Sequence, residues 1–296
     1  MDAVVEPTPV APVVAPAVSE RSQARRETIR QLVRRPAFIV GILILLGWTI
    51  TAVLGERITP YDPFNSLSRR QLPPGAEHLL GTDRLGRDVL SRLMVGSRDV
   101  LVVAPLAAIV GVVSGTFLGL VMGFYRGIVD DVLSRLVEAF LALPVILVAL
   151  LTLVVLGSSP VVVIAVVGIL FTPIVARTVR SAVLSERQLD YVTAARLRGE
   201  SGPFILSREI FPNVLGPTIV EMTVRFGYAI FTVATLSFLG VGIQPPSPDW
   251  GLTVSQEYTN MISGVWWPTL FPALAIASTV IAVNLIADSL QSVLNE

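Results

Sequence analysis

Six long apolar stretches limit what this sequence can fold into. A helix that crosses the hydrocarbon core of a bilayer needs about 20 mainly apolar residues. The stretches that meet this length are 37–55, 100–125, 132–156, 161–179, 215–243 and 268–290. Their apolar residues run continuously, whereas strands of a membrane barrel would alternate apolar and polar residues. Because helices satisfy their own backbone hydrogen bonds in lipid, we expect an all-α membrane protein with about six transmembrane helices.

The composition agrees with this expectation and excludes several kinds of chemistry. The 296 residues are 53% hydrophobic and only 15% charged, whereas soluble domains are about one-quarter charged. The net charge is zero, so no general affinity for nucleic acid is expected. There is no cysteine, no lysine and one histidine, His78. Thiol chemistry, P-loop lysine chemistry and a histidine-rich or cysteine metal site are therefore not expected.

The residues ahead of the first span form two parts. Residues 1–20 are rich in Pro, Ala and Val, which predicts a disordered tail and not a signal peptide. Residues 21–36 carry six arginines interleaved with apolar residues, the pattern of a basic amphipathic helix on a membrane surface. Because arginine-rich flanks remain in the cytoplasm, we expect the N-terminus and, after six spans, the C-terminus to be cytoplasmic.

Spans and charges together predict the order of the remaining segments. After the first transmembrane helix, 37–55, we expect an external loop at 56–99, a five-helix core at 100–290 with a cytoplasmic loop at 181–213, and a C-terminal tail at 291–296. In the external loop, arginines alternate with acids, which predicts local ion pairs.

The cytoplasmic loop contains signals for two short helices. Asp190 is a suitable N-cap, and Gly199 is a suitable residue just past the end of the first helix. Ser201, with a proline two residues later, can begin a second helix. Ala194 and Ala195 would leave a small surface that the groove of a partner could approach closely. An ordinary capped connector fits the same residues, so both interpretations stay open on this evidence.

These residues resemble the coupling loop of ABC importer permeases. The family pattern is Glu-Ala-Ala, three residues, Gly, and then an Ile-Leu-Pro region. The matching positions are Ala194, Ala195, Gly199, Ile210 and Pro212. Thr193 stands in place of the Glu and Phe211 in place of the Leu, and the peptide branch of the family tolerates both changes. The resemblance implies that this loop inserts into a cleft on a cytoplasmic ATPase subunit and transmits closure of the ATPase dimer to the spans.

Two further stretches look like the C-type permeases of dipeptide, oligopeptide and nickel importers. Residues 78–93 resemble the signature ahead of the second span, and its key positions are Gly81, Asp83, Gly86, Arg87 and Asp88. The glycines permit turns, and the aspartates can cap a helix or pair with arginine. A capping and ion-pair module explains them more simply than substrate contact, which stays the alternative. Residues 237–251 would form an outer turn, line the outer mouth or meet a binding protein.

The predicted spans contain a regular glycine repeat and several prolines. Glycine recurs every fourth residue at Gly111, Gly115, Gly119 and Gly123, which gives the second span a smooth stripe for close helix packing. Pro144, Pro173 and Pro272 lie inside apolar stretches and are expected to kink them.

Glu221 and Arg225 lie four residues apart and therefore on one face of the fifth span. Charged groups inside a membrane need partners or water. A structural ion pair and a place in a gate or substrate pathway both fit this position.

The sequence thus predicts the translocation subunit, and not an enzyme, of an ABC importer that carries di- or oligopeptides across the bacterial inner membrane by alternating access. The resemblance implies four partners: a second homologous permease, one or two cytoplasmic ATPase subunits, an extracytoplasmic substrate-binding protein and membrane lipid. No cofactor is expected on this chain, because the partner subunits use ATP and Mg. Nickel or another small solute is the alternative cargo. An ion-coupled transporter or channel is the alternative class, and it would call for buried acids near the bilayer midplane.

Overall fold

The structure is a computed structural model that describes residues 30–66 and 69–294. Its helices are α2 (Pro36–Ile58), α3 (Val89–Tyr125), α4 (Ile128–Leu141), α5 (Val145–Leu156), α6 (Pro160–Glu186), α7 (Asp190–Leu197), α8 (Gly202–Phe204), the π-helix η1 (Ile205–Ile210), α9 (Phe211–Phe238), α10 (Trp250–Glu257), the 3-10 helix η2 (Tyr258–Ser263) and α11 (Trp267–Leu294). The predicted tail at 1–20 and most of the predicted basic helix at 21–36 lie outside the described residues, but residues 30–34 are helical.

The helices confirm the predicted fold class. Within the described residues, five helical segments are long and apolar enough to cross a membrane: α2, α3, α6, the continuous run of α8, η1 and α9, and α11. Helices α4 and α5 meet the same criterion only as a pair. The protein therefore has five candidate spans, or six when the pair counts as one.

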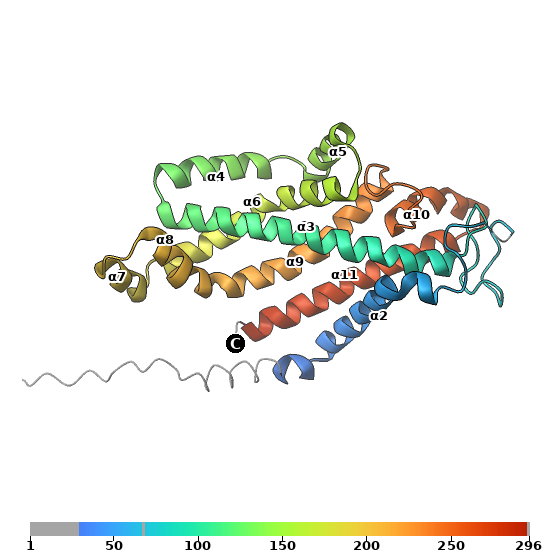
Figure 1. Ribbon diagram of the computed structural model, residues 1–296, viewed down its shortest axis with the longest axis horizontal. Coiled ribbons are helices and arrows are strands. Elements are labelled where there is room, and N and C mark those ends of the chain that lie inside the picture. The colour runs from blue at the N-terminus through green and yellow to red at the C-terminus, as the bar shows by residue number, and fades with distance from the viewer. Residues whose placement is uncertain (1–29, 67–68, 295–296) are drawn as a thin grey trace, which may run out of the picture.

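The long helices lie side by side along the long axis of the molecule, as Figure 1 shows for α3, α6, α9 and α11. Helix α2 packs against α3 and α11. Helices α7 and α8 lie at one end of the molecule, which we call the α7 end. Residues 59–66 and 69–88 lie with α10 at the opposite end, which we call the α10 end. The Arg35 guanidinium donates a hydrogen bond to the Ser292 hydroxyl, which joins the start of α2 to the end of α11.

The third predicted span, 132–156, is interrupted at Pro144, where a kink was expected. Helix α4 ends at Leu141, α5 begins at Val145, and the two axes are bent by 86°. Pro144 is the N-cap of α5 and has no N–H with which to continue a helix. By contrast, α6 continues through Pro173 and α11 through Pro272. Residues 142–147 are all exposed, so no neighbouring helix holds this part of the chain straight.

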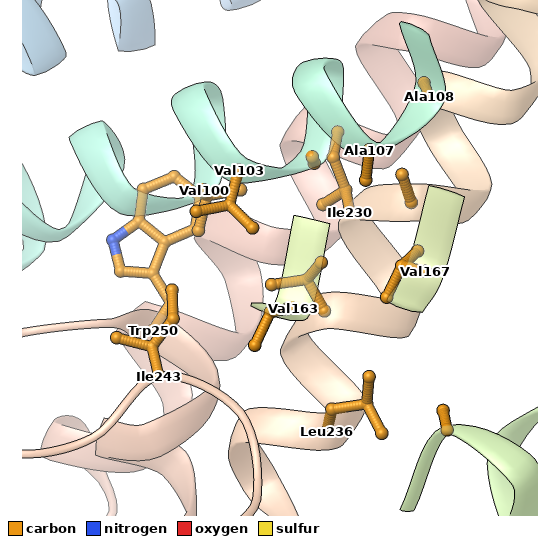
Figure 2. Close-up of a cluster of buried hydrophobic side chains, with 14 of the residues drawn as sticks. Val100, Val103, Ala107, Ala108, Val163, Val167, Ile230, Leu236, Ile243 and Trp250 are labelled. Carbon is orange, nitrogen blue, oxygen red and sulfur yellow. The ribbon is translucent and has the colours of Figure 1, made fainter. Parts of the chain in front are cut away.

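The largest apolar core lies between α3, α6 and α9 near the α10 end. Figure 2 shows the fully buried Trp250 beside Val100 and Val103 of α3, with Val163 of α6 close by. The Trp250 indole Nε1 donates to the Leu93 carbonyl at 2.9 Å. The Trp250 ring also packs edge-on against Trp48 of α2, with 4.7 Å between ring centroids. This one side chain therefore ties α10 to two spans.

Candidate functional site

The predicted coupling loop forms helix α7 and a tight turn after it. Gly199 has φ +77° and follows the C-cap Arg198, as expected for the residue that ends a helix. The amides of Gly199 and Glu200 close the turn on the carbonyls of Arg196 (3.0 Å) and Ala195 (3.2 Å). The predicted capping role of Asp190 is wrong: Leu189 holds the N-cap position, and Asp190 is the first helical residue without a side-chain cap.

Helix α7 has a buried face and an exposed face. Ala195 is fully buried together with Val192, so it does not share an outward surface with the exposed Ala194, as the sequence suggested. Helical geometry explains this, because adjacent residues lie about 100° apart around the axis. The outward face instead presents Leu197, which is 85% exposed. Sequence reasoning missed Leu197, although an apolar residue on a short polar helix was a usable signal.

The buried face of α7 belongs to an apolar cluster that joins it to the bundle. Val192 and Ala195 pack in one cluster with Ile210 of η1, Val183 of α6 and Phe124 of α3. Ile210 is fully buried, whereas Pro212 in the first turn of α9 is exposed. Displacement of α7 therefore acts directly on α3, α6 and the start of α9.

A hydrogen-bond chain fixes the start of α7. The Tyr191 hydroxyl donates to Glu186 Oε2 of α6 at 2.7 Å and accepts from Asn213 Nδ2 of α9 at 3.1 Å. Burial and the nearby Glu186 carboxylate raise the pKa of Tyr191 to about 12, so the phenol stays protonated and keeps its donor at physiological pH. The loop is held to both spans that it connects.

The external signature lies at the opposite end of the molecule, where it caps α3. Asp88 is the N-cap: one carboxylate oxygen accepts from the Ser91 amide at 2.8 Å, and the other lies 2.8 Å from Nδ1 of His78. Helix α3 therefore begins at Val89, eleven residues earlier than the span predicted at 100–125.

Asp83 organises the turn before that cap. Its carboxylate accepts from the amides of Leu85 (2.8 Å) and Arg87 (2.9 Å) and from Arg87 Nε (2.7 Å), while Arg92 Nε lies 3.7 Å away. Gly81 and Gly86 adopt φ values of +77° and +80° within this turn. Asp83 is 1% and Asp88 3% exposed, so both carboxylates face partners inside the protein.

The glycine stripe of α3 lies against α6. A Cβ atom built on Gly111 would lie 2.8 Å from the Gly168 carbonyl oxygen, and one on Gly115 would lie 2.6 Å from Val175 Cβ. A Cβ built on Gly119 would lie 2.6 Å from the Ala176 carbonyl oxygen, and one on Gly123 would lie 2.7 Å from Val183 Cβ. All four positions therefore require the absence of a side chain.

Glu221 and Arg225 form an ion pair on α9. Arg225 Nε lies 2.9 Å from Glu221 Oε2, and Thr178 of α6 donates to Glu221 Oε1 at 3.0 Å. The Arg225 guanidinium also lies 5.0 Å from the ring centroid of Tyr228. The structure thus separates the predicted residues into a coupling loop at the α7 end, a signature module at the α10 end, and a stripe and an ion pair within the spans.

Comparison with known protein families finds two matches. A family model described as binding-protein-dependent transport system inner membrane component matches residues 115–296, which include α7. A model described as N-terminal TM domain of oligopeptide transport permease C matches residues 22–74, which include α2.

Individual relatives match nearly end to end. The chain is 40% identical over 273 residues to a putative peptide transport system permease protein of Brucella suis biovar 1, covering 90% of each chain. It is 39% identical over 269 residues to the dipeptide transport system permease protein DppC of Escherichia coli K12, covering 88% of this chain and 89% of that one. It is 36% identical over 272 residues to the glutathione transport system permease protein GsiD of Pectobacterium atrosepticum, covering 91% and 90%.

Proposed function

We propose that this chain imports peptides, on the premise that it belongs to the family of binding-protein-dependent transport system inner membrane components. It is therefore the inner-membrane, multi-pass permease of an ABC transporter, and ATP hydrolysis belongs to other subunits. A transport system of this kind works with an ATPase and a binding protein. Di- or oligopeptides are the proposed cargo, because the relatives named above are described as peptide, dipeptide and glutathione permeases.

One observation carries the proposed coupling role. Helix α7 exposes Ala194 and Leu197 at the tip of the molecule, while its other face is buried in a cluster shared with α3, α6 and η1. A partner that binds the exposed face and changes shape would therefore displace several spans together. We infer that the segment from Asp190 to Pro212 docks into the ATPase and that closure of the ATPase dimer switches the permease between outward- and inward-open states.

The proposed orientation puts the α7 end in the cytoplasm. Arg30, Arg34 and Arg35 precede α2. Four further arginines lie between α6 and α9, whereas the segment between α9 and α11 carries none. Arginine in short segments next to spans favours the cytoplasmic side. Both described ends of the chain also lie toward this side.

Exposed apolar surface on this subunit supports the remaining proposed partners. A permease of five or six spans leaves lipid-facing apolar surface, such as Val53 of α2 (76% exposed) and Val155 of α5 (81% exposed). We propose that a second, homologous permease covers part of this surface and completes the pathway, that membrane lipid covers the rest, and that one or two ATPase subunits bind the α7 end. The binding protein would dock at the α10 end.

Nickel import is the second candidate cargo, and ion-coupled transport is the second candidate class. Among the residues that the structure describes, no group of three or more His, Cys, Asp or Glu side chains is placed to hold a metal ion. The intramembrane acid Glu221 already accepts hydrogen bonds from Arg225 and Thr178. These observations favour peptide cargo and a structural role for this pair over a coupling-ion site.

Affinity purification tests the proposed function. The tagged chain is extracted from its native membrane in mild detergent, co-purifying subunits are identified by mass spectrometry, and uptake of a dipeptide and of Ni²⁺ is compared in proteoliposomes with the binding protein. A second permease, an ATPase and ATP-dependent dipeptide uptake are expected. A chain that purifies alone and transports without ATP would refute the importer role, whereas uptake of Ni²⁺ alone would refute only the cargo.

A further inference from the structure

Two arginines at the α7 end lie close to one aromatic ring. Phe124 lies in the last turn of α3 and is 8% exposed. The guanidinium carbons of Arg187, which follows α6, and Arg196, in the last turn of α7, lie 5.9 and 6.0 Å from its ring centroid. Three elements thus meet at Phe124, and two of them bring a positive charge.

These two charges lack an anionic partner in the described chain. The ion pairs of residues 30–66 and 69–294 use other arginines. The Nη1 atom of Arg187 is buried without a hydrogen-bond partner. Burial lowers the pKa of Arg187, and the positive charges of Arg196 and Arg126 lower it further. Arg187 is half-buried and Arg196 is exposed, so an anion from outside the described chain can reach both charges. An opposite charge close to them favours their charged form.

Arg198 provides the contrast within the same loop. Its guanidinium lies 2.8 Å from Glu200 Oε1 and 3.4 Å from Glu209 Oε1. The loop therefore neutralises Arg198 with its own acids and leaves Arg187 and Arg196 uncompensated. The position that the family pattern fills with Glu is Thr193 here, so the exposed face of α7 supplies no acid at that point.

We propose that Arg187 and Arg196 together receive a carboxylate side chain of the ATPase subunit that docks at the α7 end. The inference rests on the proposed function and adds to it the chemistry of the contact. The guanidinium fork matches a carboxylate in shape and charge. A protein carboxylate is favoured over a lipid phosphate because Arg196 lies on α7, next to Leu197, on the helix that is proposed to enter the ATPase.

The contact would also link ATPase docking to the spans. An anion shared by the two arginines holds the end of α6 and the end of α7 together over Phe124 of α3. Gly202, which begins α8, approaches the same ring so closely that a Cβ there would lie 3.2 Å from Phe124 Cε1. The two arginines are therefore positioning residues that join three helix ends when the ATPase binds.

The absence of lysine from this chain allows a direct chemical test. In the intact importer complex, Arg196→Lys introduces the only lysine of this subunit. A zero-length carbodiimide then condenses that amine with a carboxylate in contact with it, with loss of water, and mass spectrometry identifies the joined peptides. We expect a link from position 196 to an Asp or Glu of the ATPase.

Arg198→Lys is the matched control, and it should link within the loop to Glu200 or Glu209. If position 198 links and position 196 links to nothing, or only to acids of this chain, the proposal is overturned. An amine held by a lipid phosphate forms no amide, so that outcome also counts against it.

A functional measurement completes the test. The double variant Arg187→Gln/Arg196→Gln should lower substrate-stimulated ATPase activity about tenfold and release the ATPase at lower salt than the wild type. Arg135→Gln, an exposed residue of α4 outside the segment that is proposed to dock, should do neither. Arg196→Lys should retain most of the activity. Co-purification of the second permease shows that the variant is folded. If wild-type complex contains no ATPase, the proposed function fails together with this inference; if it does and the double variant behaves like wild type, only this inference fails.

Discussion

A Cβ atom built on Gly119 of α3 would lie 2.6 Å from the carbonyl oxygen of Ala176 on α6. Real Cβ–oxygen contacts are not this short. The two backbones are therefore in contact at a point where only the hydrogen atom of a glycine fits. The same holds one turn away on either side, at Gly115 and Gly123. Helices α3 and α6 therefore behave as one packed pair.

Replacing Gly119 should separate this pair. Gly119→Ala forces a methyl group into occupied space, and overpacking of this kind costs about 1–3 kcal/mol. Gly47→Ala is the control, because a Cβ there has nothing within 4 Å. Thermal unfolding of the purified complex in detergent should show a lower midpoint for Gly119→Ala and little change for Gly47→Ala. Equal midpoints would contradict the backbone contact.

The effect of a substitution at Gly199 on activity should depend on whether the new residue tolerates a positive φ, and not on the size of its side chain. Its φ of +77° is costly for most residues, about 1–2 kcal/mol, yet a Cβ there meets open space. Gly199→Val should therefore reduce transport-coupled ATPase activity in proteoliposomes. Gly199→Asn should retain most of it, because Asn tolerates the left-handed region. If both variants lose activity alike, the size of the side chain matters and the explanation is wrong.

Asp249 should make stability depend on pH. Burial raises its pKa from the ordinary value of 3.8 to about 6, and the nearby Asp99 carboxylate adds to the rise. The folded state thus favours the protonated acid, so its contribution is fully present below about pH 4 and is lost as pH rises through about 6. Asp249→Asn keeps an acceptor for the Leu252 amide but cannot ionise. The unfolding midpoint of the variant should exceed that of the wild type above pH 6 but not near pH 4. A difference in midpoint that does not change with pH would argue against titration at this residue.

The contributions of Glu221 and Arg225 to stability should depend on each other. Removing one partner leaves a charge without its counter-ion inside the span, so each single Gln variant should lose about 3 kcal/mol or more. The double variant Glu221→Gln/Arg225→Gln should lose less than the sum, with a coupling energy of about 1–3 kcal/mol in a double-mutant cycle. It should also retain peptide uptake if the pair is structural. Stable protein without uptake would instead place the pair in the pathway.

The local helix signals could be read from the sequence. Gly199 ends α7 and Asp88 caps α3 because a glycine past a helix and an aspartate before one act through neighbouring backbone atoms alone. Close packing of the glycine stripe also follows from spacing, since every fourth residue lies on one face of a helix.

The features that the sequence could not supply depend on distant parts of the chain. Pro144, Pro173 and Pro272 look alike in sequence, yet only Pro144 breaks a span, because the residues around it are exposed. Ala194 and Ala195 differ in exposure because α6 and η1 pack on one side of α7. The arginines around Phe124 come from positions 187 and 196, and only the folded loop brings them to the same ring.

The length of α3 has a mechanical consequence. Its 37 residues span about 55 Å, well beyond the roughly 30 Å of hydrocarbon in a bilayer. One end starts at Asp88 in the external signature, and the other carries Phe124 beneath the cationic pair. The helix is thus long enough to extend beyond the hydrocarbon, and one continuous backbone joins Phe124 to the Asp88 end. The two faces of the membrane can then exchange signals through one piece of backbone, with Pro105 as the place where it can flex.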